Sequence, residues 1–386
     1  MAVEVGTVVR AGQELLVIAS MKLEYLVRAD RDSVVRRVSA VVGQTVAPGD
    51  PLVELEARRS PVGERPARPG GRDSRAVGAA LAAAQERHAL GLDAARPDAV
   101  GRRRRTGRRT ARENVADLCD PGTFVEYGPL AIAAQRRRRD LDDLIRNTPA
   151  DGLVGGVADV AGHPTVVVSY DYTVLAGTQG FQNHRKKDRL FELAERQHRP
   201  VVLFAEGGGG RPGDTDAPGV SGLDCLAFAL FAGLSGLVPL VGIVSGRCFA
   251  GNAALLGCCD VIIATEGSNI GMSGPAMIEG GGLGVYEPDE IGPLPVQVTN
   301  GVVDIAVTGE AEAVVVAKRY LSYFHGPTPD PWTCADQEQL QTLVPENRRR
   351  VYDIRVDLVG LADTDSVVEL RRGLGARIVT ALARVE

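Results

Sequence analysis

Lysine, paired cysteines and long apolar runs are scarce in this chain of 386 residues. Its six cysteines show no Cys-x-x-Cys spacing, so no zinc ribbon is predicted and we expect no metal site. No apolar run is long enough to cross a bilayer and no signal peptide is recognisable, so we expect a cytoplasmic protein with no membrane partner. Lys+Arg totals 44, yet only four of these residues are lysines: Lys22, Lys186, Lys187 and Lys318.

The rarity of lysine draws attention to Lys22, which follows Met21 inside the apolar run "VIASMKLEYLV". Arginine holds its proton too tightly to be acylated, whereas a lysine amine can lose its proton and be modified. A solvated strand lysine is the ordinary alternative. The residues around Lys22 decide between these two interpretations.

Those residues form an internal repeat. The run "VGTVVRAGQELLVI" from Val5 to Ile18 returns as "VGQTVAPGDPLVEL" from Val42 to Leu55, with an offset of 43 − 6 = 37 between Gly6 and Gly43. Each copy has the pattern of a strand, a turn and a second strand, so two copies predict a small all-β unit. Lys22 falls in the connection between the copies, where a hairpin would expose it.

A two-copy β-sandwich with "SMKLE" on an exposed turn resembles a biotin carboxyl carrier (biotinyl) domain, and the match covers Glu4 to about Glu56. The resemblance implies covalent biotin on Lys22. Related lipoyl carriers share the fold but usually have Asp-Lys, so Met21 favours biotin. The strand "DSVVRRVSAV" before copy two has no counterpart before copy one, so we expect a missing first strand and a poorly ordered carrier over residues 1–57.

Residues 58–75 are rich in Arg, Pro and Gly without an apolar period, which predicts a flexible linker. From residue 76 onward, strand-like and helix-like segments alternate. Examples are the strands "PVVLFAE", "VPLVGIVSG" and "DVIIATEG" and the helices "RKKDRLFELAERQ" and "GLDCLAFALFAGLSG". This alternation predicts an α/β domain with a mostly parallel sheet covered on both faces, over residues 76–350.

Two glycine-containing segments of this domain are candidates for a binding or catalytic site. In "FAEGGGGRPG" a buried strand opens into Gly207 to Gly210, but the Gly-Lys-Ser/Thr ending of a P-loop is absent. In "VGIVSGRCFAGNAALLGCCDVIIAT" a strand, a turn at Ala250 and Gly251 and an apolar helix follow one another. Backbone amides at such a turn suit a developing oxyanion.

The second segment resembles the crotonase superfamily. The motifs "RRTARENVADLCDPGTFVEYG", "TPADGLVGGVADVAG", "FAEGGGGRPG" and "NGVVDIAVTGEAEAV" are similar, in order, to the carboxyltransferase subunits of biotin-dependent acyl-CoA carboxylases. The resemblance implies an α/β crotonase-like (ClpP/crotonase) N-terminal carboxyltransferase domain that moves carboxylate from carboxybiotin to the α-carbon of an acyl-CoA such as acetyl- or propionyl-CoA. It places the oxyanion hole at Gly208 and Gly209, with Ala250 and Gly251 as a close-packed wall.

Two kinds of basic run remain. His184, Arg185, Lys186 and Lys187 are expected on one helix, where they either meet the phosphates of coenzyme A or form a solvated face. The tracts "GRRRRTGRR" and "RRRRD" do not predict nucleic-acid binding, because the net charge is −5 and no aromatic residue interleaves with them. Contacts of these arginines with a partner subunit or with coenzyme A are the preferred interpretation.

Residues 351–386 resemble the start of a second, C-terminal carboxyltransferase domain, which we expect to be poorly packed. The resemblance therefore implies three partners: a biotin carboxylase subunit, a further carboxyltransferase domain or subunit, and copies of the chain in a homo- or hetero-oligomer. Two alternatives stay open. One is a biotin-dependent acyl-CoA decarboxylase subunit, and the other is a non-catalytic acyl-CoA-binding assembly subunit.

Overall fold

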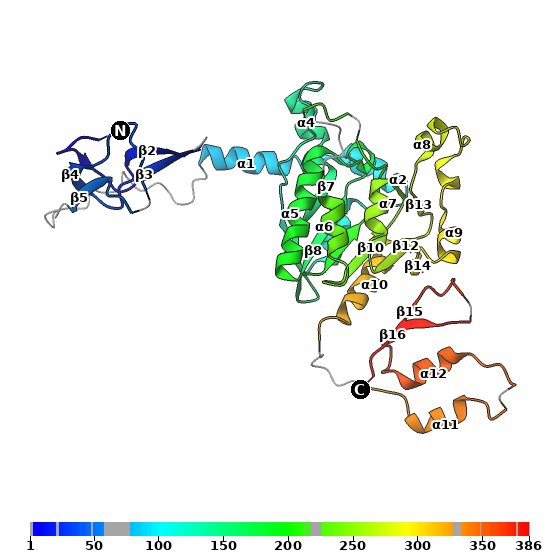
Figure 1. Cartoon of the computed structure of the whole chain (residues 1–386). Coiled ribbons are helices and arrows are strands. Elements are labelled where there is room, and N and C mark those ends of the chain that lie inside the picture. The colour runs from blue at the N-terminus through cyan, green and yellow to red at the C-terminus, as the bar shows by residue number, and fades with distance from the viewer. Residues whose placement is uncertain are drawn as a thin grey trace. The chain divides into compact units, whose positions relative to one another are not determined.

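The computed structural model describes residues 3–20, 23–47, 49–57, 78–211, 213–216, 225–326, 333–347, 349–375 and 377–385. The chain divides into two compact units, Met1–Val77 and Gly78–Glu386 (Figure 1). In the described part of the chain, no helix is both long and apolar enough to cross a membrane.

The first unit is all β, as predicted. Its short strands are β1 (Val8–Val9), β2 (Glu14–Ser20), β3 (Leu23–Arg28), β4 (Ser33–Val38) and β5 (Val53–Ala57). One sheet has the order β1-β4-β5, and β2 pairs with β3 as an antiparallel hairpin. The repeated turn glycines Gly12 and Gly49 have φ of 82° and 99°, a conformation that favours glycine, so both copies turn where the sequence predicts.

The second unit is built on one sheet of seven strands. In order across the sheet they are β14 (Ile305–Val307), β12 (Val261–Thr265), β10 (Leu240–Val244), β9 (Val201–Phe204), β8 (His163–Tyr170), β7 (Leu153–Val160) and β6 (Val125–Glu126). The pairs from β8 to β14 are parallel, whereas β7 and β6 are antiparallel. The prediction of a mostly parallel sheet is therefore confirmed.

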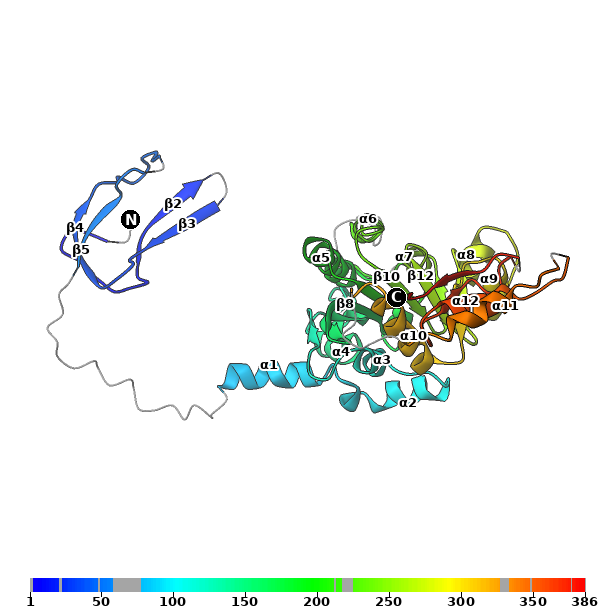
Figure 2. The same cartoon turned by 90° about the horizontal axis from the view of Figure 1, so that it is seen from below.

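Helices cover both faces of this sheet (Figure 2). On β9, Val201 and Leu203 belong to one apolar cluster and Val202 and Phe204 to another. The first cluster includes residues of α5 (Phe181–Gln197), α6 (Ala227–Gly233) and α7 (Gly251–Leu256), and the second includes α3 (Ala111–Leu118) and α10 (Glu310–Ser322). Because successive strand residues point to opposite faces, both faces are buried, which explains the continuous apolar runs.

A smaller parallel sheet lies beyond the ends of β10 and β12. It consists of β11 (Arg247–Phe249) and β13 (Asn269–Gly271). After it come α8 (Pro275–Gly280) and α9 (Leu294–Thr299), while α1 (Ala79–Ala89), α2 (Pro97–Arg105) and α4 (Leu141–Asn147) belong to the part of the chain before β7. This two-stranded sheet lies beside the loop after β9, because Cys248 of β11 forms a bridge with Gly207.

The C-terminal segment, which we expect to be poorly packed, is ordered in part but leaves large apolar side chains exposed, such as Val351 at 94% and Ile378 at 75%. After α11 (Leu340–Leu343) and α12 (Ile354–Leu361), strands β15 (Val368–Leu370) and β16 (Thr380–Leu382) form an antiparallel hairpin. Leu370 and Leu382 pack against the apolar cluster that includes α10, and Arg371 Nε lies 2.7 Å from Asp304 Oδ1. The hairpin pairs within itself and is anchored, although α12 has no buried residue.

Candidate functional site

Lys22 lies outside the described residues, so its role as the biotin attachment site stays a prediction. The strands on either side are described: β2 and β3 remain paired up to Ser20 and Leu23.

The loop after β9 contains the four glycines. Gly207 and Gly209 have φ of 126° and 83°, so side chains at these two positions would be strained. Gly207 donates to Arg247 O at 2.7 Å and accepts from Phe249 N at 2.9 Å. These bonds hold the loop against β11.

Asn252 is a functional candidate that the sequence analysis missed. Its buried side chain donates to Gly177 O at 3.1 Å and to Glu206 O at 2.8 Å. Its Oδ1 accepts from the Gly209 amide at 3.1 Å and from Gln179 Nε2 at 3.0 Å. One amide side chain therefore joins two loop segments, residues 177–179 before α5 and residues 206–209 after β9. The one available signal was a lone polar residue in the apolar run "FAGNAALL".

The two predicted oxyanion donors, the Gly208 and Gly209 amides, differ in availability because Gly209 already donates a hydrogen bond to Asn252. The Gly209 amide is already satisfied inside the protein, whereas Gly208 is exposed and its amide has no acceptor among the described residues. Ala250 lies against Gly209, because a Cβ on Gly209 would lie 2.6 Å from Ala250 Cβ and 3.4 Å from Gly251 N. The structure thus brings the four predicted residues together and leaves Gly208 as the available donor of the predicted pair.

The lysines of α5 do not occupy the exposed position that the sequence suggested. Lys187 is fully buried and donates to Tyr170 Oη at 2.8 Å and Gln179 Oε1 at 3.0 Å. Lys186 is buried and donates to Ala150 O and Leu153 O. Burial lowers the pKa of Lys186 to about 8 and that of Lys187 to about 7. A phosphate contact through these two ammonium groups is therefore contradicted, and only Arg185 of the predicted set remains exposed.

A buried polar path runs from α5 to the glycine loop. Lys187 bonds to Gln179, Gln179 bonds to Asn252, and Asn252 bonds to the Gly209 amide. Each group in this path has a partner, as buried polar groups require. The path gives Lys187 a structural role in positioning the loop.

Arg211 fixes the other end of the loop. Its buried guanidinium pairs with Asp151 and donates to Thr178 O at 2.8 Å. Asp151 and Asp214 in turn accept from the Asn183 and Phe181 amides, each at 2.8 Å, at the start of α5. Negative charge at a helix N-terminus is favourable, so this cluster ties the loop to α5.

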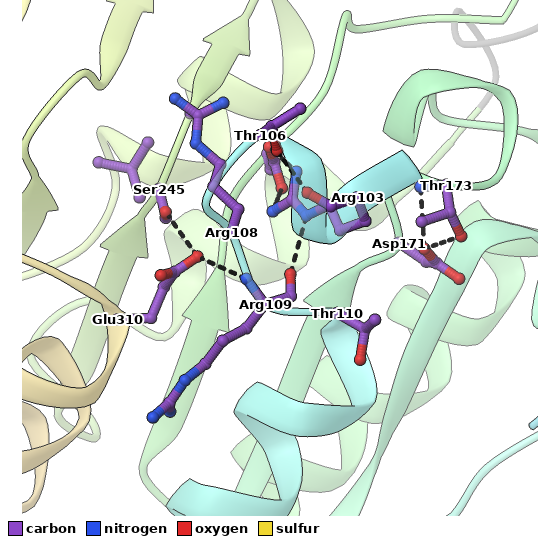
Figure 3. A network of polar contacts seen from close by, with 12 residues as sticks. Arg103, Thr106, Arg108, Arg109, Thr110, Asp171, Thr173, Ser245 and Glu310 are labelled. Carbon is purple, nitrogen blue, oxygen red and sulfur yellow. Dashed lines mark hydrogen bonds and ion pairs between the residues drawn. The ribbon is translucent and has the colours of Figure 1, made fainter. Parts of the chain in front are cut away.

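A second network of polar contacts involves the side chain of Glu206, whose backbone carbonyl accepts from Asn252. Arg103 at the end of α2 makes two 2.7 Å bonds to the Glu206 carboxylate. Burial raises the pKa of Glu206, and the Arg103 charge opposes that rise. Figure 3 shows Glu310 accepting from the Arg109 amide at 3.2 Å and from Ser245 Oγ at 2.9 Å. The arginine-rich segment is therefore attached to the ends of β9 and β10 by buried contacts.

Comparison with known proteins gives two family matches in this one chain. Residues 102–386 match the "Carboxyl transferase domain" family and residues 1–55 match the "Biotin-requiring enzyme" family. The methylmalonyl-CoA carboxyltransferase 12S subunit of Propionibacterium freudenreichii subsp. shermanii is 28% identical over 293 residues, which are 72% of this chain and 54% of that protein.

Two solved structures extend the comparison. A single-chain, multi-domain long-chain acyl-CoA carboxylase is similar over the whole of this chain and 37% of its own, with 53% identity and a TM-score of 0.77. The hexameric transcarboxylase 12S, solved with hydrolysed methylmalonyl-coenzyme A bound, is 26% identical over 79% of this chain and 60% of its own, with a TM-score of 0.65. The chain spans somewhat more than half the length of the curated relatives that it matches.

Proposed function

The chain belongs to the carboxyl transferase domain family, and from this membership we propose that it is the acyl-CoA-binding half of a carboxyltransferase joined to its own biotin carrier. One observation carries the proposal: matches to a carboxyl transferase domain and to a biotin-requiring domain occur in the same polypeptide. The reaction is transfer of a carboxyl group to the α-carbon of an acyl-CoA of the acetyl or propionyl type.

The residues of this chain position the acyl-CoA thioester and stabilise the negative charge that develops on its oxygen. The exposed Gly208 amide donates to the thioester oxygen as negative charge develops there, while Asn252 holds the adjoining Gly209 and so fixes the loop. Preorganised amides of this kind lower the barrier because they need not reorient during the reaction. Lys22 would hold biotin, which would supply the transferred carboxyl group once a biotin carboxylase has carboxylated it. Arg185 remains a proposed contact for a coenzyme A phosphate.

The proposal includes partners because the curated relatives are longer than this chain. We assign loading of biotin to a biotin carboxylase subunit and reception of biotin to a further carboxyltransferase domain or subunit. Assembly into an oligomer is supported by the hexameric 12S relative. A cytoplasmic setting belongs to the same proposal.

The carrier half is tested by co-expressing the chain with a biotin ligase and measuring its intact mass. We expect one biotin, which is absent from Lys22→Arg because arginine is not acylated. The biotinylated chain is then assayed with acyl-CoA and a biotin carboxylase, with and without the C-terminal half of a carboxyltransferase. Transfer is expected only when that half is present. Full turnover by the 386-residue chain alone, or biotin on Lys22→Arg, would contradict the assignment.

The acyl-CoA half is tested by Gly208→Val. A Cβ on Gly208 would meet only Thr178 Cγ2, at 3.6 Å, so the variant should fold. Its methyl groups would occupy the approach to the Gly208 amide, and we expect transfer to fall at least about a hundredfold. Gly210→Val is the matched control, because a Cβ there meets nothing within 4 Å. Gly209→Val is unsuitable, since its Cβ would collide with Ala250. Normal transfer by Gly208→Val would remove this loop from the mechanism.

A further inference from the structure

Gln179, two residues before α5, meets the glycine loop with both its backbone and its side chain. Its amide donates to Gly209 O at 2.7 Å, and its carbonyl accepts from the Arg211 amide at 3.0 Å. Its side chain is only 1% exposed and bonds to Lys187 at one end and to Asn252 at the other. A residue with these contacts is placed to control the conformation of the loop.

The two peptide groups that flank Gly208 are fixed by different partners. In the first, Gly207 O accepts from Phe249 N at 2.9 Å. Because the carbonyl and the N–H of a trans peptide point in opposite directions, the Gly208 N–H points away from β11. In the second, the Gly209 N–H points to Asn252 Oδ1 at 3.1 Å. Consecutive glycines have few steric restraints of their own, so these two bonds set the direction of the Gly208 amide.

The side-chain amides of Gln179 and Asn252 each have one favourable orientation. The charged amine of Lys187 donates hydrogen bonds and accepts none, so Gln179 turns its Oε1 toward it. The Nε2 of Gln179 then donates to Asn252 Oδ1 at 3.0 Å. A half-turn of the Asn252 amide would set its Nδ2 against two donors and its Oδ1 against two carbonyls. Each hydrogen bond of the path therefore selects the next one.

We propose that Gln179 is a positioning residue for carboxyl transfer and that Lys187 sets its orientation. Gln179 is buried, so it acts through Asn252, which holds Gly209 and so keeps the Gly208 N–H in one direction. A donor that is already oriented lowers the barrier, because it need not turn while charge develops. This inference rests on the proposed function, in which the Gly208 amide donates to the thioester oxygen.

Gln179→Glu tests the direction of the hydrogen bonds. It keeps the size of the side chain and gives Lys187 an ion-pair partner, but it turns the donor that faces Asn252 Oδ1 into an acceptor. Gln179→Met is the matched variant, because it has a similar length and no charge. Transfer is assayed with the C-terminal half of a carboxyltransferase at about pH 6.5, below the pKa of about 7 that burial gives Lys187. We expect kcat to fall at least about tenfold in Gln179→Glu and less than about threefold in Gln179→Met, with KM for the acyl-CoA unchanged.

The double variant Lys187→Met with Gln179→Glu tests the part of Lys187. Without the ammonium group, burial favours the neutral form of the new carboxyl, whose O–H can donate to Asn252 Oδ1 as the amide did. We expect its kcat to be at least about threefold higher than that of Gln179→Glu alone. A merely structural role predicts the opposite, because two substitutions in a packed core disturb it more than one.

Hydrogen exchange of the Gly209 amide, read by mass spectrometry in the peptide that spans residues 205–210, needs no activity. Exchange should be about tenfold faster in Gln179→Glu than in the unsubstituted chain and close to normal in Gln179→Met. Gln197→Glu introduces the same charge at an exposed position at the end of α5 and is the control, which should change neither exchange nor kcat.

Equal kcat in the two Gln179 variants, a change confined to KM, or a double variant slower than Gln179→Glu would overturn the inference. Thermal melting of each variant checks the fold. Should Gln179→Glu fail to fold, the double variant is compared with Gln179→Met, and a lower kcat in the double variant then counts against the inference. Absence of transfer by the unsubstituted chain contradicts the proposed function instead, and hydrogen exchange alone then decides whether Gln179 orients the loop.

Discussion

Two helices carry runs of basic residues, and the fold uses the two runs in opposite ways. We call residues 184–187 the α5 cluster and residues 102–105 the α2 cluster. In the α5 cluster every residue except Arg185 is buried, whereas in the α2 cluster every residue except Arg103 is exposed. The α5 cluster holds the glycine loop in place, and the α2 cluster borders an open cavity.

The difference shows that a basic run indicates a ligand only where its charges remain uncompensated. Lys187 uses its donors on Tyr170 and Gln179, so nothing is left for a phosphate. Arg102 has no ion-pair partner in the described chain, so its charge is available. Both runs consist of four consecutive basic residues, His-Arg-Lys-Lys and four arginines, and tertiary contacts decide which charges remain available.

The largest expected effect concerns Arg103, the buried exception of the α2 cluster. Replacing Arg103 by Gln leaves the Glu206 carboxylate buried without its charged partner, since the pair is only 6% and 9% exposed. We expect a loss of about 3 to 5 kcal/mol in the free energy of unfolding, measured by urea denaturation. Arg105→Gln should leave the midpoint unchanged. Equal stability of the two variants would erase the distinction between buried and exposed members of this cluster.

The sheet was predictable because its signal is local. Segments such as "PVVLFAE" are apolar throughout, which is typical of strands buried on both faces, and Val201 to Phe204 do face two apolar clusters. The turn glycines of the first unit were predictable for the same reason, since Gly12 and Gly49 recur at one offset in the repeat.

The burial of the α5 lysines was not predictable, because its cause lies far away in the sequence. A Cβ on Gly128 would lie 3.4 Å from the Lys186 side chain, and the acceptors of Lys186 are Ala150 and Leu153. In "HRKKDRL" nothing marks which side of the helix these distant segments cover. Asn252 was missed similarly, since its four partners come from two loops that are distant in the sequence.

The next effect is a pH dependence from Lys187. Burial lowers its pKa to about 7 in the folded protein, whereas an unfolded lysine titrates near 10.4. Above pH 7 the unfolded chain therefore binds more protons than the folded one, and stability rises with pH. Between pH 7 and 8 the gain should be about 1 kcal/mol. Lys187→Met should lose most of this gain and keep the smaller part that comes from Lys186, whose pKa is about 8, and urea midpoints at both pH values measure it.

Lys186 also titrates in this window, because burial lowers its pKa to about 8, but most of its stabilising contribution comes above pH 8. Two other strongly shifted groups, His184 and Cys119, titrate outside the window. Burial lowers the pKa of His184 to about 3, so its contribution changes below the window. Burial raises the pKa of the Cys119 thiol to about 12, so that contribution appears as unfolded thiols ionise above the window. Lys318→Met, which removes a partly exposed lysine, serves as the control and should keep the wild-type slope. A variant Lys187→Met with an unchanged slope would contradict the burial argument.

The smallest expected effect concerns Arg185, the exposed exception of the α5 cluster. Arg185 lies 5.9 Å from the Phe181 ring and lines a surface hollow together with Arg189, Asp188 and Glu192. Two carboxylates there offset the two guanidinium groups. Lys186 also lines the hollow, but its ammonium group is buried and donates to Ala150 O and Leu153 O. We therefore expect Arg185→Gln to change coenzyme A affinity by less than about twofold in a calorimetric titration of the full chain. A tenfold loss in Arg185→Gln would reverse the comparison, because the phosphate would then be bound at α5 by the one member of that cluster whose charge the fold leaves exposed.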